Sequence, residues 1–557
     1  MLEEGKEISK LIDTDTMHAT HRSAQPDDRR KDTTYYNPQV KEKPGVPSAS
    51  NEDTTKRRVR GTIGGDRINY PGDVSARTAD MEVVKVLVNS VVSTNAQWMT
   101  LDIEDYYLGT PLPRHEWLRI HIKFIPDDIR AKYGLDPYID GDHILFCVTK
   151  GMYGLPQAGI LAQERLCRHL ASFDYVQDPN VPCLFLHSSN GISFTLVVDD
   201  FGVKYYTRDA ADHLIACLRV LYKLKVDWTG RHYLGMTLVF DEADRSVALS
   251  MPGYISKLLE RFTRRGPQLQ AKSPAVYVPW YPRSGPQFVE PDVSPLLTAA
   301  EIKEVQEIVG CFLWYGRVID STYLPAVNAI NSEMVDPTQR LLRDCERLLA
   351  YAASYPDNVL VYRASDMVLE VQSDASYLSR SRSRSVAGGL GYLGTGGATS
   401  TPNGAIFTHS AVLDVVVASA GEAEYGAAFT IAQKAEFTRT ILMALGHPQP
   451  ATVIYSDNKC AIGLATDTVK QRRSKSVDMR YHWLRDRVRQ GHFNVLWISG
   501  KQLLADFFTK ALPVHRHQLL MKSLVSIPIA APDHFLNARA RIANAHRAHA
   551  ALGLVAQ

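Results

Sequence analysis

The chain has 557 residues, which at roughly 100–200 residues per domain predicts several domains. Its apolar fraction of 45% and charged fraction of 22% are ordinary for globular proteins and exclude a collagen-like or wholly disordered chain. The 63 basic and 60 acidic residues leave a formal net charge of only +3, so any nucleic-acid binding has to come from local basic patches.

The cysteines and the hydropathy pattern indicate a cellular location. Seven cysteines are scattered singly without a CxxC pair, which supports neither a disulfide framework nor a zinc knuckle. The first residues lack the basic-then-apolar pattern of a signal peptide, and no apolar run approaches the ~20 residues that span a bilayer. We therefore expect an intracellular protein of the cytoplasm or nucleus that is neither secreted nor inserted in a membrane.

The first half of the chain is predicted to be mixed in secondary structure. Residues 1–58 are polar and poor in apolar side chains, so we predict that they are disordered. Residues 59–245 then alternate between strands and helices, and the strongest patterns come in a fixed order. These are a strand over 98–103, a helix over 159–173, a hairpin of 193–198 and 201–206, and a helix over 210–224. This order resembles a split β-α-β unit on an antiparallel sheet.

The second half of the chain contains a helical region and then a second mixed region. Residues 246–366 carry apolar side chains at helical spacing, interrupted by a proline-rich connection. Residues 367–515 read as strand, glycine-rich hairpin, helix, strand and helix, whereas residues 516–557 form a tail with basic character. The predicted fold class is therefore α/β, with an α+β part first and an α/β part near the end.

Three aspartates in the first region form a candidate metal site. Asp102 closes the predicted strand, and Asp199 and Asp200 sit between the two strands of the predicted hairpin. They can meet only if those strands are neighbours in one sheet. Carboxylates gathered at strand ends suit Mg²⁺, and two such ions can activate an attacking hydroxyl group and stabilise a leaving group. The alternative is that the Asp-Asp pair is ordinary turn chemistry.

Three motifs place these aspartates in a known context. They are DIEDYYLGTPL at 102–112, GMYGLPQA at 151–158 and VVDD at 197–200. Together, and in this order, they resemble the catalytic motifs of the reverse transcriptases of copia-type retrotransposons. The resemblance implies a right-hand polymerase in which Asp102, Asp199 and Asp200 hold the metal ions. Val197 stands where the family usually has tyrosine, which we interpret as a branch of the family rather than a decayed copy.

The same resemblance implies roles for four further residues. Tyr107 would place its ring against the sugar and select deoxynucleotides, and Gln157 would lie beside the incoming nucleotide or the template. Arg60 and Arg67 would grip the triphosphate. The alternatives are a core aromatic residue for Tyr107, a helix cap for Gln157 and ordinary surface arginines for the other two.

A second set of four acidic residues lies between 367 and 515. Asp374 and Asp457 each end a predicted strand, Glu424 lies on a helix with Ser419 as its predicted N-cap, and Asp506 opens a final helix. With their flanks SDA, EAEY, DN and ADxxTK, they resemble the ribonuclease H motifs of the same family. The resemblance implies phosphodiester hydrolysis with two Mg²⁺ ions. We expect Glu424 rather than its neighbour Glu422 to bind metal.

Basic residues near this set are candidates for nucleic-acid contacts. The segment 470–485 has six Lys or Arg residues against one Asp, and it resembles a family signature in which Lys475, Arg480 and His482 would contact an RNA–DNA hybrid. Ser476 stands where the family has histidine. The run of Arg380, Arg382 and Arg384 could likewise contact phosphate. The alternatives are a solvated helix face and a flexible hairpin tip.

The resemblance covers about residues 59–515 and implies an RNA-directed DNA polymerase with a fused ribonuclease H. It assigns fingers and palm to 59–245, thumb and connection to 246–366, and a ribonuclease H-like domain to 367–515. The implied cofactors are two Mg²⁺ ions per active site, with Mn²⁺ as an alternative. The implied partners are an RNA template, a DNA primer, RNA–DNA hybrid and deoxynucleoside triphosphates, with the oligomeric state left open.

Two rival functions follow from the same motifs. Protease, knuckle and integrase motifs are absent upstream, so we expect a part of a longer polyprotein or a gene model that starts inside one. This keeps open an inactive retroelement remnant that at most binds nucleic acid. The second rival is a nuclease in which the palm serves only as a scaffold.

Overall fold

The computed structural model describes residues 2–43, 56–262, 270–278, 292–396, 403–468 and 478–527. The chain divides into two compact units, one of residues 1–80 and 97–229 and one of residues 81–96 and 230–557. Both combine helices with sheets, which confirms the predicted α/β class. Among the described residues, no helix is both long and apolar enough to cross a bilayer.

The first unit begins with ordered structure, so the prediction of disorder over residues 1–58 is wrong where the chain is described. Helix α1 (Leu2–Asp13) is followed by β1 (Met17–Thr20), β2 (Thr34–Lys43) and β3 (Lys56–Ile63). The few apolar residues of this segment lie on one side, and Ile8, Leu11 and Met17 are fully or almost fully buried. Average composition misses such an amphipathic pattern, because burial depends on where the apolar side chains stand and not on how many there are.

These strands belong to a six-stranded sheet with the order β1-β7-β5-β2-β3, and β6 pairs with β7. The other strands are β5 (Pro111–His121), β6 (Ile139–Asp140) and β7 (His143–Lys150), and α3 (Asp127–Tyr133) lies between β5 and β6 in the chain. Ile120, Phe146 and Val148 are buried in the same core cluster as α1. The N-terminal segment is therefore part of this core.

The second sheet of the first unit carries the predicted split β-α-β order. Its strand order is β12-β4-β11-β10-β9-β8, and every pair is antiparallel. The strands are β4 (Gln97–Ile103), β8 (Tyr175–Gln177), β9 (Leu184–His187), β10 (Ser193–Val197), β11 (Asp200–Tyr205) and β12 (Leu224–Asp227), and the helices are α4 (Ala158–Ala171) and α5 (Arg208–Arg219). The predicted elements are confirmed, except that the second helix ends at Arg219 because the chain turns to form β12 beside β4.

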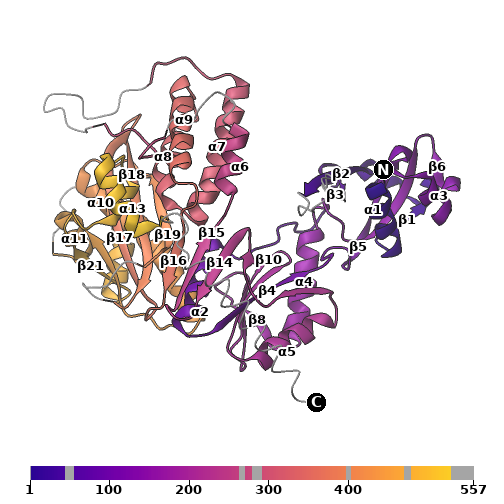
Figure 1. Cartoon of the computed structure of the whole chain (residues 1–557), viewed down its shortest axis with the longest axis horizontal. Helices are drawn as coiled ribbons and strands as arrows, with labels where there is room; N and C mark the ends of the chain where they lie inside the picture. Colours follow the sequence, from indigo (N-terminus) through magenta and orange to yellow (C-terminus); the bar gives the residue numbers. More distant parts are fainter. Residues whose placement is uncertain are drawn as a thin grey trace, which may run out of the picture. The chain divides into compact units, whose positions relative to one another are not determined.

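The second unit contains a small sheet beside a group of helices. The sheet order is β13-β14-β15-β16, and α6, α7 and α8 each contact a neighbouring helix of the group (Figure 1). The elements are α2 (Met81–Ser93), β13 (His232–Tyr233), β14 (Met236–Asp241), β15 (Ser246–Ser250), α6 (Tyr254–Phe262), α7 (Ala299–Val318), α8 (Leu324–Ser332), α9 (Gln339–Ser354) and β16 (Leu360–Arg363). Thr298 and Glu301 form a capping box at the start of α7, which fixes where that helix begins.

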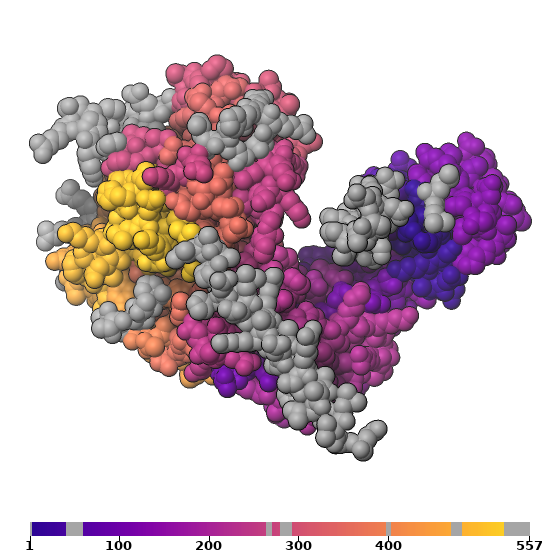
Figure 2. Space-filling view, in the orientation of Figure 1, coloured from indigo at the N-terminus to yellow at the C-terminus, as the bar shows by residue number. Residues whose placement is uncertain are grey.

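The rest of the second unit is a five-stranded sheet covered by α10, with the strand order β19-β18-β17-β20-β21 (Figure 1). Gly389 lets α10 approach this sheet, because a Cβ atom there would lie 2.5 Å from Ile431. The elements are β17 (Val368–Arg380), β18 (Arg384–Gly394), β19 (Ala405–Val412), α10 (Ala420–Ala444), β20 (Thr452–Ser456), α11 (Lys459–Ala465), α12 (Asp478–Arg489), β21 (Phe493–Trp497) and α13 (Val514–Leu524). The space-filling view shows the C-terminal described residues, in yellow, on the surface of this unit (Figure 2).

Candidate active sites

The strand register of the first unit brings the predicted aspartates together. Strand β11 pairs with β4 so that Asp200 lies directly opposite Asp102, and the amide of Ile103 donates to the carbonyl oxygen of Asp199 at 3.1 Å. The turn of the hairpin consists of Val198 and Asp199, since Val197 pairs with Asp200. Val198 has φ of 61°, a left-handed conformation that a β-branched residue rarely adopts. The tight turn therefore holds Asp199 beside the end of β4.

The three carboxylates act on one another electrostatically. Burial, reinforced by the charges of Asp199 and Asp102, raises the pKa of Asp200 to about 6. Burial also raises the pKa of Asp199, with Asp102 adding to the shift and Arg60 and Lys225 opposing it. The amine of Lys225 lies 3.4 Å from a carboxylate oxygen of Asp102. Three acids that repel each other beside a lysine form a place where a bound cation would relieve the repulsion.

The second acidic set converges more closely. Among the described residues, one group of potential ligands has its donor atoms all within 4.8 Å of one another, and it consists of Asp374, Glu424 and Asp457. Two of these positions follow from strand register, because β17 and β20 are parallel with Gln372 opposite Tyr455. Asp374 follows Gln372 by two residues, and Asp457 follows Tyr455 by two residues, so the two aspartates come at the same level of the parallel pair. Asp374 does not end its strand as predicted, because β17 continues to Arg380.

Helix α10 supplies the third carboxylate. Ser419 caps the helix as predicted, since its hydroxyl oxygen accepts from the amide of Glu422 at 3.2 Å. The side chain of Glu422 accepts in return from the amide of Ala418 at 2.8 Å. Glu422 is thereby used in the cap, while Glu424 belongs to the acidic group. The preference for Glu424 over Glu422 agrees with this geometry.

Asp506 lies beside the group but not in the predicted helix. It belongs to a short 3-10 turn, Leu504–Phe508, and the next helix starts only after Pro513. Asp506 pairs with Lys510. The hydroxyl of Thr509 donates to a carboxylate oxygen of Asp374 at 2.6 Å. The sequence interpretation missed Thr509 and Lys510 as site residues, although both belong to the motif that located Asp506.

The environment of this second group fits a divalent cation. Burial, then the charge of Asp506, raises the pKa of Asp374 to about 7. Burial, then the charges of Asp374 and Asp457, raises the pKa of Glu424 to about 9. One carboxylate oxygen of Glu424 is buried without a hydrogen-bond partner. An orphaned buried oxygen beside two further carboxylates is a donor set that Mg²⁺ or Mn²⁺ satisfies.

Comparison with known proteins identifies the relatives. The Pol polyprotein from transposon TNT 1-94 of Nicotiana tabacum is 26% identical over 388 residues, covering 69% of this chain and 28% of that protein. The Pol polyprotein from transposon RE2 of Arabidopsis thaliana is 27% identical over 379 residues, covering 66% of this chain and 24% of that protein. The chain is a relative of copia-type retrotransposon Pol polyproteins.

The relationship to these Pol polyproteins is partial in length. The Ty1-JR2 Gag-Pol polyprotein of Saccharomyces cerevisiae is 21% identical over 466 residues, covering 81% of this chain and 25% of that protein. The chain thus spans about a quarter of the length of the curated relatives it matches. No family model matches the chain.

A solved structure of foamy viral protease-reverse transcriptase in complex with RNA/DNA hybrid is similar to the present chain. The match covers 88% of the present chain and 52% of the viral chain. Its TM-score is 0.46 and its sequence identity is 12%.

Tyr107 and Arg60 lie with the aspartates of the first unit. The ring of Tyr107 packs edge-on against that of Tyr153, with 5.3 Å between centroids, and the guanidinium of Arg60 lies 4.1 Å from the Tyr153 centroid. Burial, then the charge of Asp199, raises the pKa of Tyr107, whereas Arg60 lowers it. These contacts place all four residues in one neighbourhood. The guanidinium of Arg67 lies over the ring of Tyr35, 5.2 Å from its centroid, and its role in gripping the triphosphate stays a prediction.

Gln157 lies in a buried polar cluster. Its side chain is fully buried, and its amide nitrogen donates to Glu116 at 3.0 Å. The buried carboxylate of Glu116 also accepts from Arg29 at 2.6 Å and from Arg114 at 2.8 Å. Gln157 stands at the N-cap position of α4, as the alternative interpretation expected, but its side chain makes no cap hydrogen bond. The buried position also does not support direct contact with a nucleotide.

The remaining basic candidates lie in the segment around α12 and in the hairpin between β17 and β18. Lys475 lies outside the described residues, Arg480 falls within α12, and His482 is exposed on that helix. In the arginine run, Arg382 pairs with Asp336, and Arg384 pairs with Glu333 at 3.3 Å. Two of the three arginines of this hairpin tip therefore make ion pairs within the chain.

Proposed function

We propose that the chain is an RNA-directed DNA polymerase with a fused ribonuclease H. In this assignment the fingers and palm lie in residues 59–245, the thumb and connection in 246–366 and the ribonuclease H-like domain in 367–515, and the ordered N-terminal segment joins the fingers. The observation that carries the proposal is that one pair of strands in each unit brings acids together, with Asp200 opposite Asp102 in the first unit and Asp374 beside Asp457 in the second.

In the polymerase site, Asp102, Asp199 and Asp200 would hold divalent ions. Such ions, when bound, assist deprotonation of the primer hydroxyl and stabilise the leaving pyrophosphate. Arg60 places a positive charge near Asp199, where the triphosphate of a deoxynucleotide would bind. Tyr107 is half-buried against Tyr153, so its ring is held firmly enough to exclude a 2′-hydroxyl group.

In the nuclease site, Asp374, Glu424 and Asp457 would hold the ions that activate water for hydrolysis of the RNA strand. Thr509 orients the carboxylate of Asp374 through its hydrogen bond. Lys510 brings a positive charge to the edge of the group: burial lowers its pKa, but Asp506, Asp374 and Asp457 more than offset this, so that the pKa is raised. The lysine therefore stays charged and can attract the phosphate of a substrate.

Primer extension by the purified chain tests the polymerase function. With Mg²⁺, a primed RNA template and deoxynucleoside triphosphates, wild type should extend the primer, and Asp199→Asn should be slower by ~10²–10³-fold, the loss typical of removing one group that stabilises transition-state charge. A wild type that synthesises no more DNA than Asp199→Asn would contradict the proposal. This result would also be expected of the inactive remnant.

A second candidate function is a nuclease with an inactive palm. The specific observation in its favour is that, among the described residues, Asp374, Glu424 and Asp457 form the one group of three potential ligands whose donor atoms all lie within 4.8 Å of one another. This candidate predicts cleavage of RNA in a hybrid that is lost in Asp457→Asn, together with no incorporation of deoxynucleotides by wild type.

A further inference from the structure

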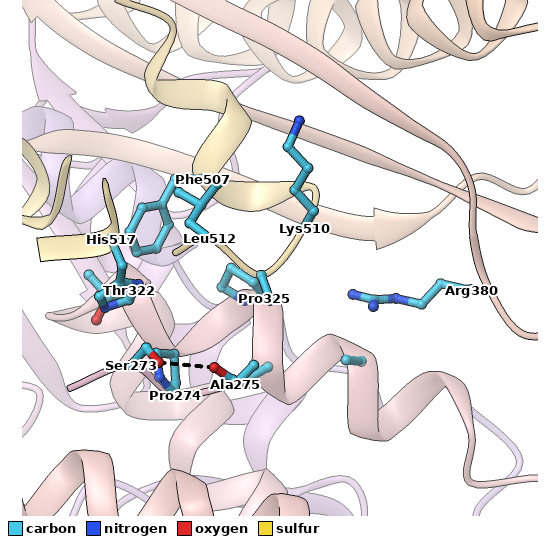
Figure 3. Close-up of a pocket in the computed structure, with 13 residues that line it drawn as sticks. Ser273, Pro274, Ala275, Thr322, Pro325, Arg380, Phe507, Lys510, Leu512 and His517 are labelled. Carbon is cyan, nitrogen blue, oxygen red and sulfur yellow. Dashed lines mark hydrogen bonds between the residues drawn. The ribbon is translucent and has the colours of Figure 1, made fainter. Parts of the chain in front are cut away.

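A pocket in the second unit lies between the end of β17, helix α8 and the turn that contains the nuclease motif. Its walls are mostly apolar, and two of its lining residues, Arg380 and Lys510, are cationic (Figure 3). Figure 3 shows the guanidinium of Arg380 pointing across the pocket toward Pro325. The other wall residues include Ala326 and Leu512.

Arg380 differs from its neighbours in having no partner. Within the described parts of the chain, its side chain makes no hydrogen bond and no ion pair, whereas Arg382 pairs with Asp336 and Arg384 with Glu333. The carboxylate of Glu333 is already used, since its two oxygens also accept from the hydroxyl of Ser381 at 2.7 Å. A partly buried guanidinium with no partner is costly to the folded protein unless an anion joins it.

The charges around Arg380 do not cancel. The groups that act on it are Arg340, Arg384, Glu333 and Asp344, so with Arg380 itself three arginines face two carboxylates. Asp344 is 3.9 Å from Arg340 and is therefore partly compensated. The two carboxylates that act on Arg380 are thus shared with other arginines, and the apolar walls strengthen the attraction of its guanidinium for an anion.

The pocket is also connected to the acidic group. Lys510 lines the pocket and pairs with Asp506, and Thr509, the residue before it, bonds to Asp374. A nucleic-acid strand that places one phosphate at the acidic group would carry further phosphates along the same surface. The phosphates along the nucleic-acid backbone are anions, and one of them could pair with the guanidinium of Arg380.

We propose that the Arg380 pocket is a phosphate-binding subsite that holds a backbone phosphodiester of the nucleic acid bound at the nuclease site. This inference rests on the proposed ribonuclease H function. It assigns a phosphate ligand to a guanidinium that no residue of the described chain pairs with. The expected role is to position the strand, and Arg380 takes no part in the bond-breaking step.

The test compares Arg380→Gln with Arg382→Gln in the full chain. Arg382 is the matched control, because it lies two residues away, is 58% exposed and already pairs with Asp336. Binding of a fluorescent RNA–DNA hybrid is measured by anisotropy in EDTA over a range of salt concentrations. The Arg380 variant should bind more weakly, and its slope of log affinity against log salt should be shallower by about 0.7–0.9, the amount for one lost phosphate contact. Arg380→Lys should restore part of the slope.

Equal salt slopes for the Arg380 and Arg382 variants would overturn the subsite. If Arg380→Gln fails to fold, wild type answers instead: bound hybrid should protect Arg380 from an arginine-selective dicarbonyl reagent, and an unchanged modification rate would overturn the proposal. Protection by inorganic phosphate but not by hybrid would also overturn it, since the ligand would then be a free anion. Hybrid cleavage in Mg²⁺ is measured separately, so failure of the nuclease function is distinguished from failure of the subsite.

Discussion

The two acidic groups are built by the same device but are completed to different degrees. In the first unit, Asp102 and Asp200 face each other across an antiparallel pair, with Lys225 beside them. In the second, Asp374 and Asp457 stand on parallel neighbours, and Glu424 arrives from a helix packed on the sheet. Strand register alone brings acidic positions side by side. In the second unit the helix adds a third carboxylate, and the donor atoms of Asp374, Glu424 and Asp457 all lie within 4.8 Å of one another.

The largest expected difference between the two acidic groups comes from substituting one carboxylate of the second group and measuring both activities. Glu424→Gln should reduce hybrid cleavage by ~10²–10³-fold and leave primer extension near wild type, because the polymerase carboxylates lie in the other unit. Glu422→Gln is the matched control and should lower stability by only about 1 kcal/mol through the weakened cap. Gel assays of both activities check this. Equal loss of cleavage in the two variants would contradict the role assigned to Glu424.

The next largest expected effect is a loss of stability when a buried residue of the ordered N-terminal segment is substituted. Leu11 is fully buried in the core of the first unit, so Leu11→Ala should lower the free energy of unfolding of that unit by about 2–5 kcal/mol. Lys6 lies on the same helix with its side chain 63% exposed, so Lys6→Ala should change the free energy little. Denaturant unfolding measures both. If residues 1–58 were disordered, the two variants would be equally stable.

Much of the architecture could be predicted from the sequence, because alternation and spacing locate strands and helices that bury apolar faces. The strand at Trp98 and the cap at Ser419 follow directly from local pattern. The burial of Gln157 could not be predicted, since it depends on Glu116 and Arg29, which are distant in the chain. The lack of a partner for Arg380 likewise depends on how α8 meets the hairpin, which no local pattern reports.

A buried histidine makes the free energy of unfolding of the second unit depend on pH. Burial lowers the pKa of His517 in the second unit to about 4, and its ring nitrogen lies 3.1 Å from the Tyr351 hydroxyl. Because the unfolded chain takes up this proton near pH 6.5 and the folded chain does not, the contribution of His517 to stability is lost as pH falls from about 6.5 toward 4, by on the order of 3 kcal/mol. Thermal unfolding across this range should show that the stability of wild type relative to His517→Gln falls by about this amount as pH falls. An unchanged dependence would contradict the buried neutral histidine.

The smallest expected effect is the stabilisation of the second unit by a bound divalent ion. At a Mn²⁺ concentration 100 times its dissociation constant, binding to the second unit should stabilise it by about 2.7 kcal/mol. The gain should be absent in Glu424→Gln and kept in Asp199→Asn. Calorimetric unfolding with and without Mn²⁺ measures this. Stabilisation that persists in Glu424→Gln would place the ion elsewhere.

The central claim is that two separate sets of acidic side chains bind divalent ions. Crystals grown with Mn²⁺, primed template and an incoming nucleotide test it most directly through the anomalous signal of the metal. We predict anomalous peaks among Asp374, Glu424 and Asp457 in one unit and among Asp102, Asp199 and Asp200 in the other. Well-ordered crystals with no peak at either set, or with peaks only at other residues, would contradict the account.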